Sequence, residues 1–145
     1  MPKVLITGGS GLIGSKLSTL LRDRGTDVVH VSRNVTGKEE FKTYEWDVKN
    51  QTMDSKALDG VESIIHLVGA PIAEEKWTAE RKKEILDSRV LSAKYLLDTC
   101  QANNIKLEHF ISASAIGWYP QVISDTIYDE SAEVASGFLG DVCKD

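Results

Sequence analysis

The chain of 145 residues is 41% hydrophobic and 27% charged, which is typical of a globular protein, and its length predicts a single domain over residues 1–145. A net charge of −5 without long runs of one sign argues against nucleic acid or a membrane as partner, and no apolar stretch is long enough to span a bilayer. The two cysteines, Cys100 and Cys143, have no metal-ligand spacing, so we expect free thiols, no metal site and a cytoplasmic location.

Short apolar runs alternate with helical patterns in the first half of the chain. The run Lys3–Thr7 is apolar without alternation, as expected of a strand buried on both faces of a parallel sheet. The apolar residues after it recur at helical spacing up to Gly25, which predicts a helix that ends there. Further strands are predicted at Asp27–Ser32 and at Lys42–Val48, and the second of these is more polar and therefore nearer an edge of the sheet.

The same alternation continues in the second half. We predict a short helix over Met53–Leu58, a fourth strand over Glu62–Pro71, the longest helix over Ala79–Asn103 and a fifth strand over Glu108–Ala115. A last helix begins in ASGFLGDVCKD, and no closing strand follows it. This order predicts an α/β fold, a Rossmann-like doubly wound parallel sheet with helices on both faces. We interpret the chain as the N-terminal part of a longer one, truncated before a C-terminal substrate region.

The first loop is rich in glycine. Residues Thr7–Gly14 read TGGSGLIG, and the glycines at positions 8, 11 and 14 form G-x-x-G-x-x-G between the first strand and the first helix. Residues without a Cβ allow a tight turn and a close approach to a pyrophosphate, and the helix N-terminus offers unpaired N–H groups to the anion. This context favours a dinucleotide site over the alternative, a glycine-rich turn without ligand. No G-K-[ST] follows, which argues against nucleoside triphosphate hydrolysis.

The end of the second strand discriminates between the two nicotinamide cofactors. An acidic residue there favours a free ribose 2′-OH, whereas arginine favours a 2′-phosphate. The strand ends in Ser32, Arg33 and Asn34, and no acidic residue follows until Glu39. The sequence therefore favours NADP(H) over NAD(H), with a solvated loop arginine as the alternative.

Two further strand ends are candidates for contacts with the adenosine half of the cofactor. Asp47 and Val48 end the third strand, where a carboxylate could accept the adenine amino group; a capping aspartate is the equally good alternative. Leu67–Pro71 ends the fourth strand with small residues that permit a close approach of the backbone, and an ordinary turn is the alternative there.

Several segments together resemble a known family. TGGSGLIG, WDV, HLVGAPI, KW, DSRV, ISASAIGWY and GFLGDVC are similar to the extended, epimerase-like branch of the short-chain dehydrogenase/reductase superfamily. The combination HLVGAPI…KWT…RKKEI…SRV with SASAIGWY is more specific and resembles its atypical NADP-binding subgroup, the nucleoside-diphosphate-sugar epimerase family proteins. The resemblance covers essentially the whole chain. It implies pyrophosphate contacts from Gly8, Ser10, Gly11, Leu12 and Ile13, 2′-phosphate contacts from Ser32 and Arg33, and adenosine and ribose contacts from Leu67, Val68, Gly69 and Ala70.

The resemblance also implies a catalytic serine, Ser114, which would hydrogen-bond the reacting carbonyl or hydroxyl; Ser112 competes for that role. Catalysis in the superfamily relies on Y-x-x-x-K, a tyrosine acid/base with a lysine one helical turn later. That motif is absent here, because Phe138 and Val142 stand where the alignment expects the tyrosine and the lysine. The subgroup shares this absence. Tyr119 is the nearby tyrosine that could substitute as acid/base.

Two functions follow from these residues. The first is an enzyme that catalyses NADP-dependent redox chemistry, or epimerisation by transient oxidation, on a sugar nucleotide or a related carbonyl compound. The second is a non-enzymatic NADP(H)-binding module that reports redox state to a partner. The resemblance further implies that the long helix, Ala79–Asn103, pairs with its copy in a homodimer.

Overall fold

The computed structural model describes all 145 residues, which form two compact units. The first unit comprises Met1–Gly69 and Leu91–Ala113, and the second comprises Ala70–Val90 and Ser114–Asp145. That residues 1–145 form one domain stays a prediction.

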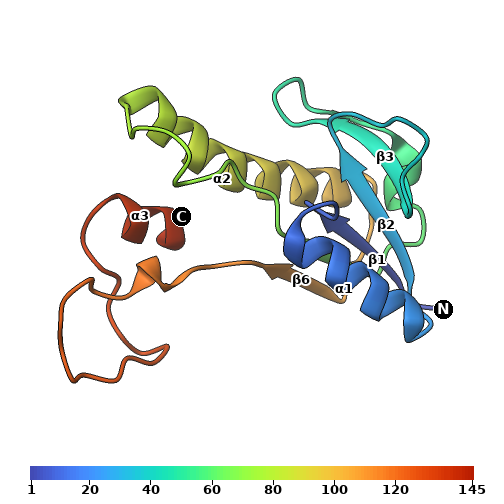
Figure 1. Ribbon diagram of the computed structural model, residues 1–145. Helices are drawn as coiled ribbons and strands as arrows, with labels where there is room; N and C mark the ends of the chain where they lie inside the picture. The colour runs from blue at the N-terminus through green and yellow to red at the C-terminus, as the bar shows by residue number, and fades with distance from the viewer. The chain divides into compact units, whose positions relative to one another are not determined.

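The first unit is built on a six-stranded sheet with the strand order β4-β3-β2-β1-β5-β6 (Figure 1). All neighbouring strands run parallel except β4, which is antiparallel to β3. The predicted doubly wound parallel sheet is therefore confirmed, and so is the position of β3 near an edge. The strands are β1 (Lys3–Thr7), β2 (Asp27–Ser32), β3 (Lys42–Asp47), β4 (Thr52–Met53), β5 (Ser63–His66) and β6 (His109–Ser112).

Helices cover both faces of this sheet. Helix α1 (Leu12–Asp23) covers one face, where Leu17 and Leu21 pack against β1 and β2. Helix α2 (Ala79–Ala102) passes through both units, and its residues in the first unit include Leu96 and Cys100, which pack on the opposite face. Each fully buried aliphatic side chain contributes roughly 1.5–3 kcal/mol to stability.

Successive residues of β1 alternate between these faces. Leu5 belongs to the cluster on the α2 face, whereas Val4 and Ile6 belong to the cluster on the α1 face. Because side chains of a strand point alternately to its two faces, an uninterrupted apolar run is what a strand covered on both faces requires. This explains why the unbroken run Lys3–Thr7 predicts β1 to the residue.

Two predicted elements are corrected. Met53 lies in strand β4, not in a helix, because residues 52–53 pair with residues 46–47 of β3. Only a short 3₁₀ turn follows, η1 (Ser55–Leu58), which the Asp54 carboxylate caps by accepting a hydrogen bond from the N–H of Lys56 at 3.0 Å. Strand β5 ends at His66 and does not continue to residue 71, because the next N–H groups turn towards the side chain of Thr7.

Besides the first part of α2, the second unit holds a long connection and two short helical segments. The turn η2 (Ile116–Trp118) contacts helix α3 (Phe138–Lys144), which confirms the helix predicted near the end of the chain. The Trp118 indole N–H donates a hydrogen bond to the carbonyl of Ala132 at 3.0 Å. This bond joins the two ends of the loop over residues 119–131. None of the helices of the chain is long and apolar enough to cross a membrane.

Candidate cofactor site

The glycine loop joins β1 to α1 in a tight turn. Gly8 has φ +68, in the left-handed region that favours glycine, and its carbonyl accepts a hydrogen bond from the N–H of Gly11 at 3.0 Å. A Cβ on Gly14 would lie 2.3 Å from the Gly8 carbonyl oxygen, so the third glycine allows the helix to start directly against the loop. A Cβ on Gly8 would lie 3.1 Å from the backbone of Leu67 and Val68. The structure thus brings these predicted cofactor residues together.

The N-terminus of α1 is open to an anion. Gly11 is its N-cap residue, no side chain caps it by a hydrogen bond, and its first turn contains no acidic residue. The first N–H groups of a helix lack intrahelical partners and carry a partial positive charge. Leu12 and Ile13 are 84% and 67% exposed, so the first turn of this helix faces solvent. Together with the exposed Ser10, these residues fit the pyrophosphate of a dinucleotide.

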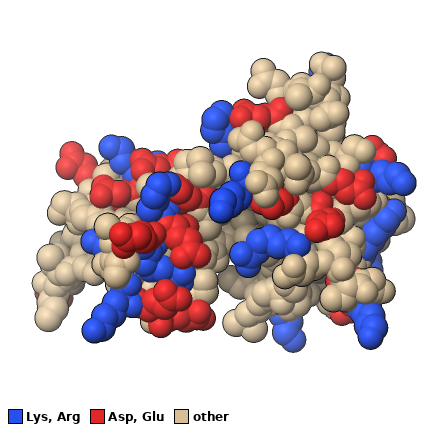
Figure 2. Space-filling model, turned by 90° about the horizontal axis from the view of Figure 1, so that it is seen from above, with Lys and Arg blue, Asp and Glu red and all other residues tan.

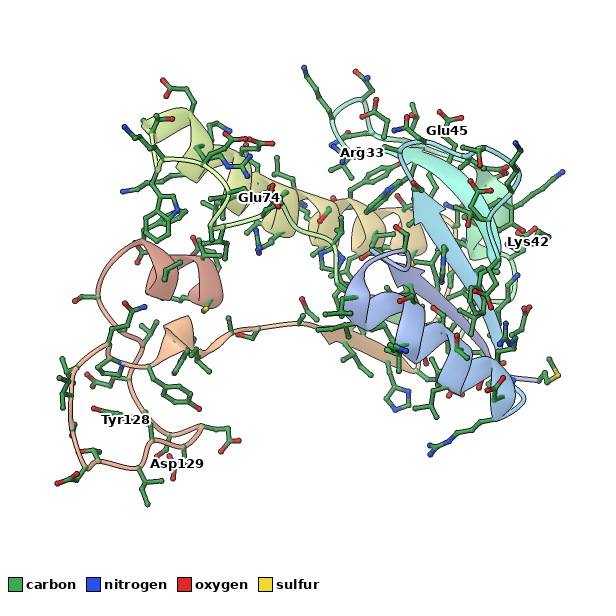
Figure 3. The ribbon with its side chains drawn as sticks, viewed as in Figure 1. Arg33, Lys42, Glu45, Glu74, Tyr128 and Asp129 are labelled. Carbon is green, nitrogen blue, oxygen red and sulfur yellow. The ribbon has the colours of Figure 1, made fainter.

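Arg33 lies on the loop that follows β2 and is exposed (Figure 3). The preceding Ser32 forms a turn, in which its hydroxyl accepts from the N–H of Asn34 at 3.3 Å. The next acidic residue along the chain, Glu39, is engaged in its own turn: its carboxylate accepts from the N–H and the hydroxyl of Thr36 at 2.6 and 2.9 Å. These bonds lower the pKa of Glu39. The end of β2 therefore provides no carboxylate that could accept a hydrogen bond from a ribose 2′-OH.

Asp47 ends β3 and caps the turn that follows. Its carboxylate accepts from the backbone N–H of Asn50 at 3.1 Å and from its side-chain amide at 2.7 Å, and these bonds lower the pKa of Asp47. The capping alternative is thus what the structure shows, and a contact between Asp47 and adenine stays a prediction. Val48 is half-buried and packs against the sheet core.

A buried hydroxyl holds the start of the loop after β5. The hydroxyl of Thr7, which is 0% exposed, accepts from the N–H groups of Leu67 and Val68 at 3.0 and 3.2 Å and lies 2.9 Å from Nδ1 of His66. Because its oxygen already accepts two hydrogen bonds, its own hydrogen is directed to Nδ1. Nε2 then carries the ring hydrogen and donates to the hydroxyl of Ser92 at 3.1 Å. The sheet thereby fixes one tautomer of His66 and the path of this loop.

The last of the predicted adenosine residues, Ala70, lies in the second unit, where two residues of α2 hold it. Its N–H donates to the hydroxyl of Ser88 at 2.8 Å, and both terminal nitrogens of Arg89 donate to its carbonyl at 3.2 Å. Burial lowers the pKa of Arg89. This clamp gives a structural reason for the DSRV segment. Gly69, one residue earlier, ends the first segment of the first unit.

The candidate catalytic residues Ser114 and Tyr119 line a shallow cavity of the second unit. Its volume is about 490 Å³, and its lining includes Trp118 and Glu130. The Tyr119 ring stacks on Tyr128, which Figure 3 labels, at a centroid distance of 5.8 Å. Both candidates thus belong to one cavity, although their role in catalysis stays a prediction.

The ring of Phe138, which the resemblance places at the position of the superfamily tyrosine, packs against neighbouring side chains. It begins α3 and meets the Trp77 ring edge-on at 5.2 Å, while the ammonium of Lys82 lies 5.4 Å from its centroid. Val142 on the same helix is half-buried. A phenyl ring and an isopropyl group can neither donate nor accept a proton, so the acid/base pair of the superfamily cannot operate at these positions.

Sequence reasoning missed the supporting residues of the site. Thr7 and His66 are polar residues at the ends of apolar strands, and that interruption was the signal that could have identified them. Ser88 and Arg89 lie in a segment that the resemblance singles out, but the sequence gives no indication that they bind Ala70. On the face in Figure 2, Lys and Arg side chains are interspersed with Asp and Glu side chains.

Comparison with protein families identifies relatives along nearly the whole chain. The profile of the NAD-dependent epimerase/dehydratase family matches residues 4–137. Epimerase family proteins of Mycobacterium leprae and Mycobacterium bovis are 30% and 31% identical over 142 residues. The alignments cover 98% of this chain and 45% and 46% of the relatives. The chain thus spans about half the length of the curated relatives it matches.

Solved structures share the fold. The human epimerase family protein SDR39U1, crystallised with NADPH, has a TM-score of 0.79 and 24% identity over 98% of this chain and 46% of its own. A nucleoside-diphosphate sugar epimerase from Corynebacterium glutamicum has a TM-score of 0.76 and 32% identity over 99% of this chain and 29% of its own. MoeE5, in complex with UDP-glucose and NAD, has a TM-score of 0.75 and 26% identity over 98% of this chain and 46% of its own.

Proposed function

We propose that this chain, which belongs to the NAD-dependent epimerase/dehydratase family, binds NADP(H) and serves hydride-transfer chemistry on a sugar nucleotide or a related carbonyl compound. The observation that carries the proposal is the uncapped N-terminus of α1 behind the glycine loop, with Arg33 and no acidic residue at the end of β2. Support for the sugar nucleotide comes from MoeE5, which was crystallised with UDP-glucose.

Different residues of the chain would bind the cofactor and act on the substrate. The N–H groups at the start of α1 bind the pyrophosphate, and Arg33 pairs with the 2′-phosphate. When bound, the cofactor supplies or accepts the hydride. Ser114 orients the reacting carbonyl or hydroxyl through a hydrogen bond, and Tyr119 is the candidate that moves the proton. Both side chains line the same cavity of the second unit.

Cofactor choice is tested by titrating the protein with NADPH and with NADH and following the fluorescence of the reduced nicotinamide. Replacement of Arg33 by alanine removes a charge-assisted contact of about 1.5–3 kcal/mol, so NADPH should bind roughly 10- to 100-fold more weakly while NADH is unaffected. Arg24→Ala, an exposed arginine at the C-terminal end of α1, is the matched control and should change neither affinity. Equal affinities for both cofactors that Arg33→Ala leaves unchanged would rule out the NADP(H) assignment.

A non-enzymatic NADP(H)-binding module is the second candidate, and the packing of Phe138 favours it. The ring contacts Trp77 and Lys82 at the position where the resemblance expects the acid/base tyrosine of the superfamily. The two functions are separated by following oxidation of NADPH with a panel of sugar nucleotides and simple carbonyl compounds. Turnover that Ser114→Ala abolishes supports the enzyme. NADPH binding without turnover of any compound supports the module.

A further inference from the structure

His30 lies beneath the glycine loop, in a position that the proposed cofactor contacts do not explain. It is the fourth residue of β2, it pairs in register with Ile6 of β1, and only 7% of it is exposed. Its Nε2 is 2.7 Å from the hydroxyl of Ser18, a fully buried residue of α1. That hydroxyl donates to the carbonyl of Gly14 at 2.6 Å. A chain of two hydrogen bonds therefore joins the sheet to the third glycine of the motif.

The imidazole also explains a glycine outside the G-x-x-G-x-x-G pattern. A Cβ on Gly9 would lie 2.5 Å from three carbon atoms of the His30 ring, far inside van der Waals contact. Gly9 does not have a left-handed φ, so its φ does not require glycine. The requirement for glycine at position 9 thus comes from the ring of His30, which fills the space of a side chain.

The hydrogen bonds fix the tautomer of His30. The hydroxyl of Ser18 has a single hydrogen, which it donates to Gly14, so it accepts from His30, and Nε2 must carry a hydrogen. Burial lowers the pKa of His30 below its ordinary value of 6.5, and the smaller effect of Glu40 acts in the opposite direction. The neutral ring with its hydrogen on Nε2 is therefore the form that the fold favours.

The charged groups around the ring belong to α1 and to the segment before β3. Arg22 pairs with Glu40 at 2.7 Å, and its guanidinium lies 5.1 Å from the Phe41 ring centroid. Phe41 in turn contacts the imidazole at a centroid distance of 5.1 Å. Ser18 and Gly9 are uncharged. Glu40, which is already paired with Arg22, is the charged group that favours an additional proton on His30.

We propose that His30 is a positioning residue of the dinucleotide site: its neutral imidazole supports Gly9 and, through Ser18, holds the carbonyl of Gly14, so that the N–H groups of the loop are ordered before the cofactor binds. Preorganisation of this kind increases affinity because fewer conformations are lost on binding. The inference rests on the proposed function, since it concerns the same site.

A double-mutant cycle tests the contact between Gly9 and His30, with the dissociation constant for NADPH as readout. Gly9→Ala alone pushes the loop away from the ring and should weaken binding about tenfold or more. In the His30→Ala background the added methyl group enters the vacated space, so the same substitution should weaken binding by less than about threefold. An equal effect of Gly9→Ala in both backgrounds would overturn the proposal. If the unmodified protein does not bind NADPH at all, the proposed function is overturned instead.

Two further variants keep the test decisive even if His30→Ala does not fold. His30→Gln retains an N–H donor near the position of Nε2 and should bind NADPH within about threefold of the unmodified protein, whereas His30→Leu removes the donor and should bind about tenfold more weakly. His109→Gln, a substitution of an exposed histidine on β6, is the matched control and should have no effect. Equal affinities of His30→Leu and His30→Gln would contradict the hydrogen-bonded role.

A pH series distinguishes positioning from simple packing. As the pH falls through the lowered pKa of His30, protonation should weaken NADPH binding more in the unmodified protein than in His30→Gln. The two proteins share every other titrating group, and the cofactor 2′-phosphate, with a second pKa of about 6, is common to both titrations. Parallel pH profiles would show that the protonation state of His30 has no influence on the loop.

Discussion

Replacing Thr7 with valine removes one hydroxyl and leaves the volume of the side chain nearly unchanged. The N–H of Leu67 keeps the Thr7 carbonyl as an acceptor at 3.2 Å, but the N–H of Val68 and Nδ1 of His66 lose their hydrogen bonds to the hydroxyl of Thr7, which is fully buried. A buried polar group that loses its hydrogen bond costs about 1–3 kcal/mol, so Thr7→Val should lower the free energy of unfolding by about that amount. The loop after β5 should also become less ordered, and NADPH binding should weaken.

Urea unfolding followed by tryptophan fluorescence measures this change, because Trp46 is only 3% exposed in the same unit. Thr43→Val is the matched control. Its hydroxyl is half-buried and donates a single hydrogen bond, to the carbonyl of Phe41 at 2.9 Å, so its loss should cost about 1 kcal/mol or less. If Thr7→Val is no more destabilising than Thr43→Val, the hydroxyl of Thr7 does not hold the loop, and the tautomer assigned to His66 is wrong.

The remaining predictions concern glycines and thiols. Gly14→Ala places a Cβ 2.3 Å from the Gly8 carbonyl oxygen, so it should abolish measurable NADPH binding in a fluorescence titration; retained affinity would contradict the tight loop. Gly25→Ala, at φ +82 with open space around it, should cost about 1 kcal/mol in urea unfolding and leave NADPH binding unchanged. Because burial raises the pKa of Cys100, a disulfide reagent at neutral pH should modify Cys143 first, and faster reaction of Cys100 would contradict its burial.

The parts of the fold that the sequence predicted well are those with local causes. The run Lys3–Thr7 predicts β1 to the residue, and Gly25, at φ +82, lies just after α1 as the helical pattern requires. The elements that sequence reasoning misplaced depend on distant partners. Strand β4 exists only because Thr52–Met53 pairs with β3. Strand β5 stops at His66 because the N–H of Leu67 donates a hydrogen bond to the hydroxyl of Thr7, which lies 60 positions before Leu67 in the chain.

The same distinction applies to the site. The glycines at positions 8, 11 and 14 identify the loop because a turn before a helix is a local feature. The sequence left two roles open for Asp47, a contact with adenine and the capping of a turn. The structure shows the capping role, through hydrogen bonds from Asn50 to the Asp47 carboxylate. The importance of Gly9 was invisible, because the ring that excludes a side chain there comes from another strand. Contacts of this kind follow from packing and not from spacing along the chain.

The most direct measurement of the central claim is to record the backbone amide resonances of the protein while NADPH is added. If the uncapped N-terminus of α1 and Arg33 hold the cofactor, the amides of residues 8–14 and of Arg33 shift together with one dissociation constant. NADH should shift the amides of residues 8–14 as well but leave Arg33 less affected. The account is contradicted if NADPH shifts other amides and leaves those of residues 8–14 unchanged.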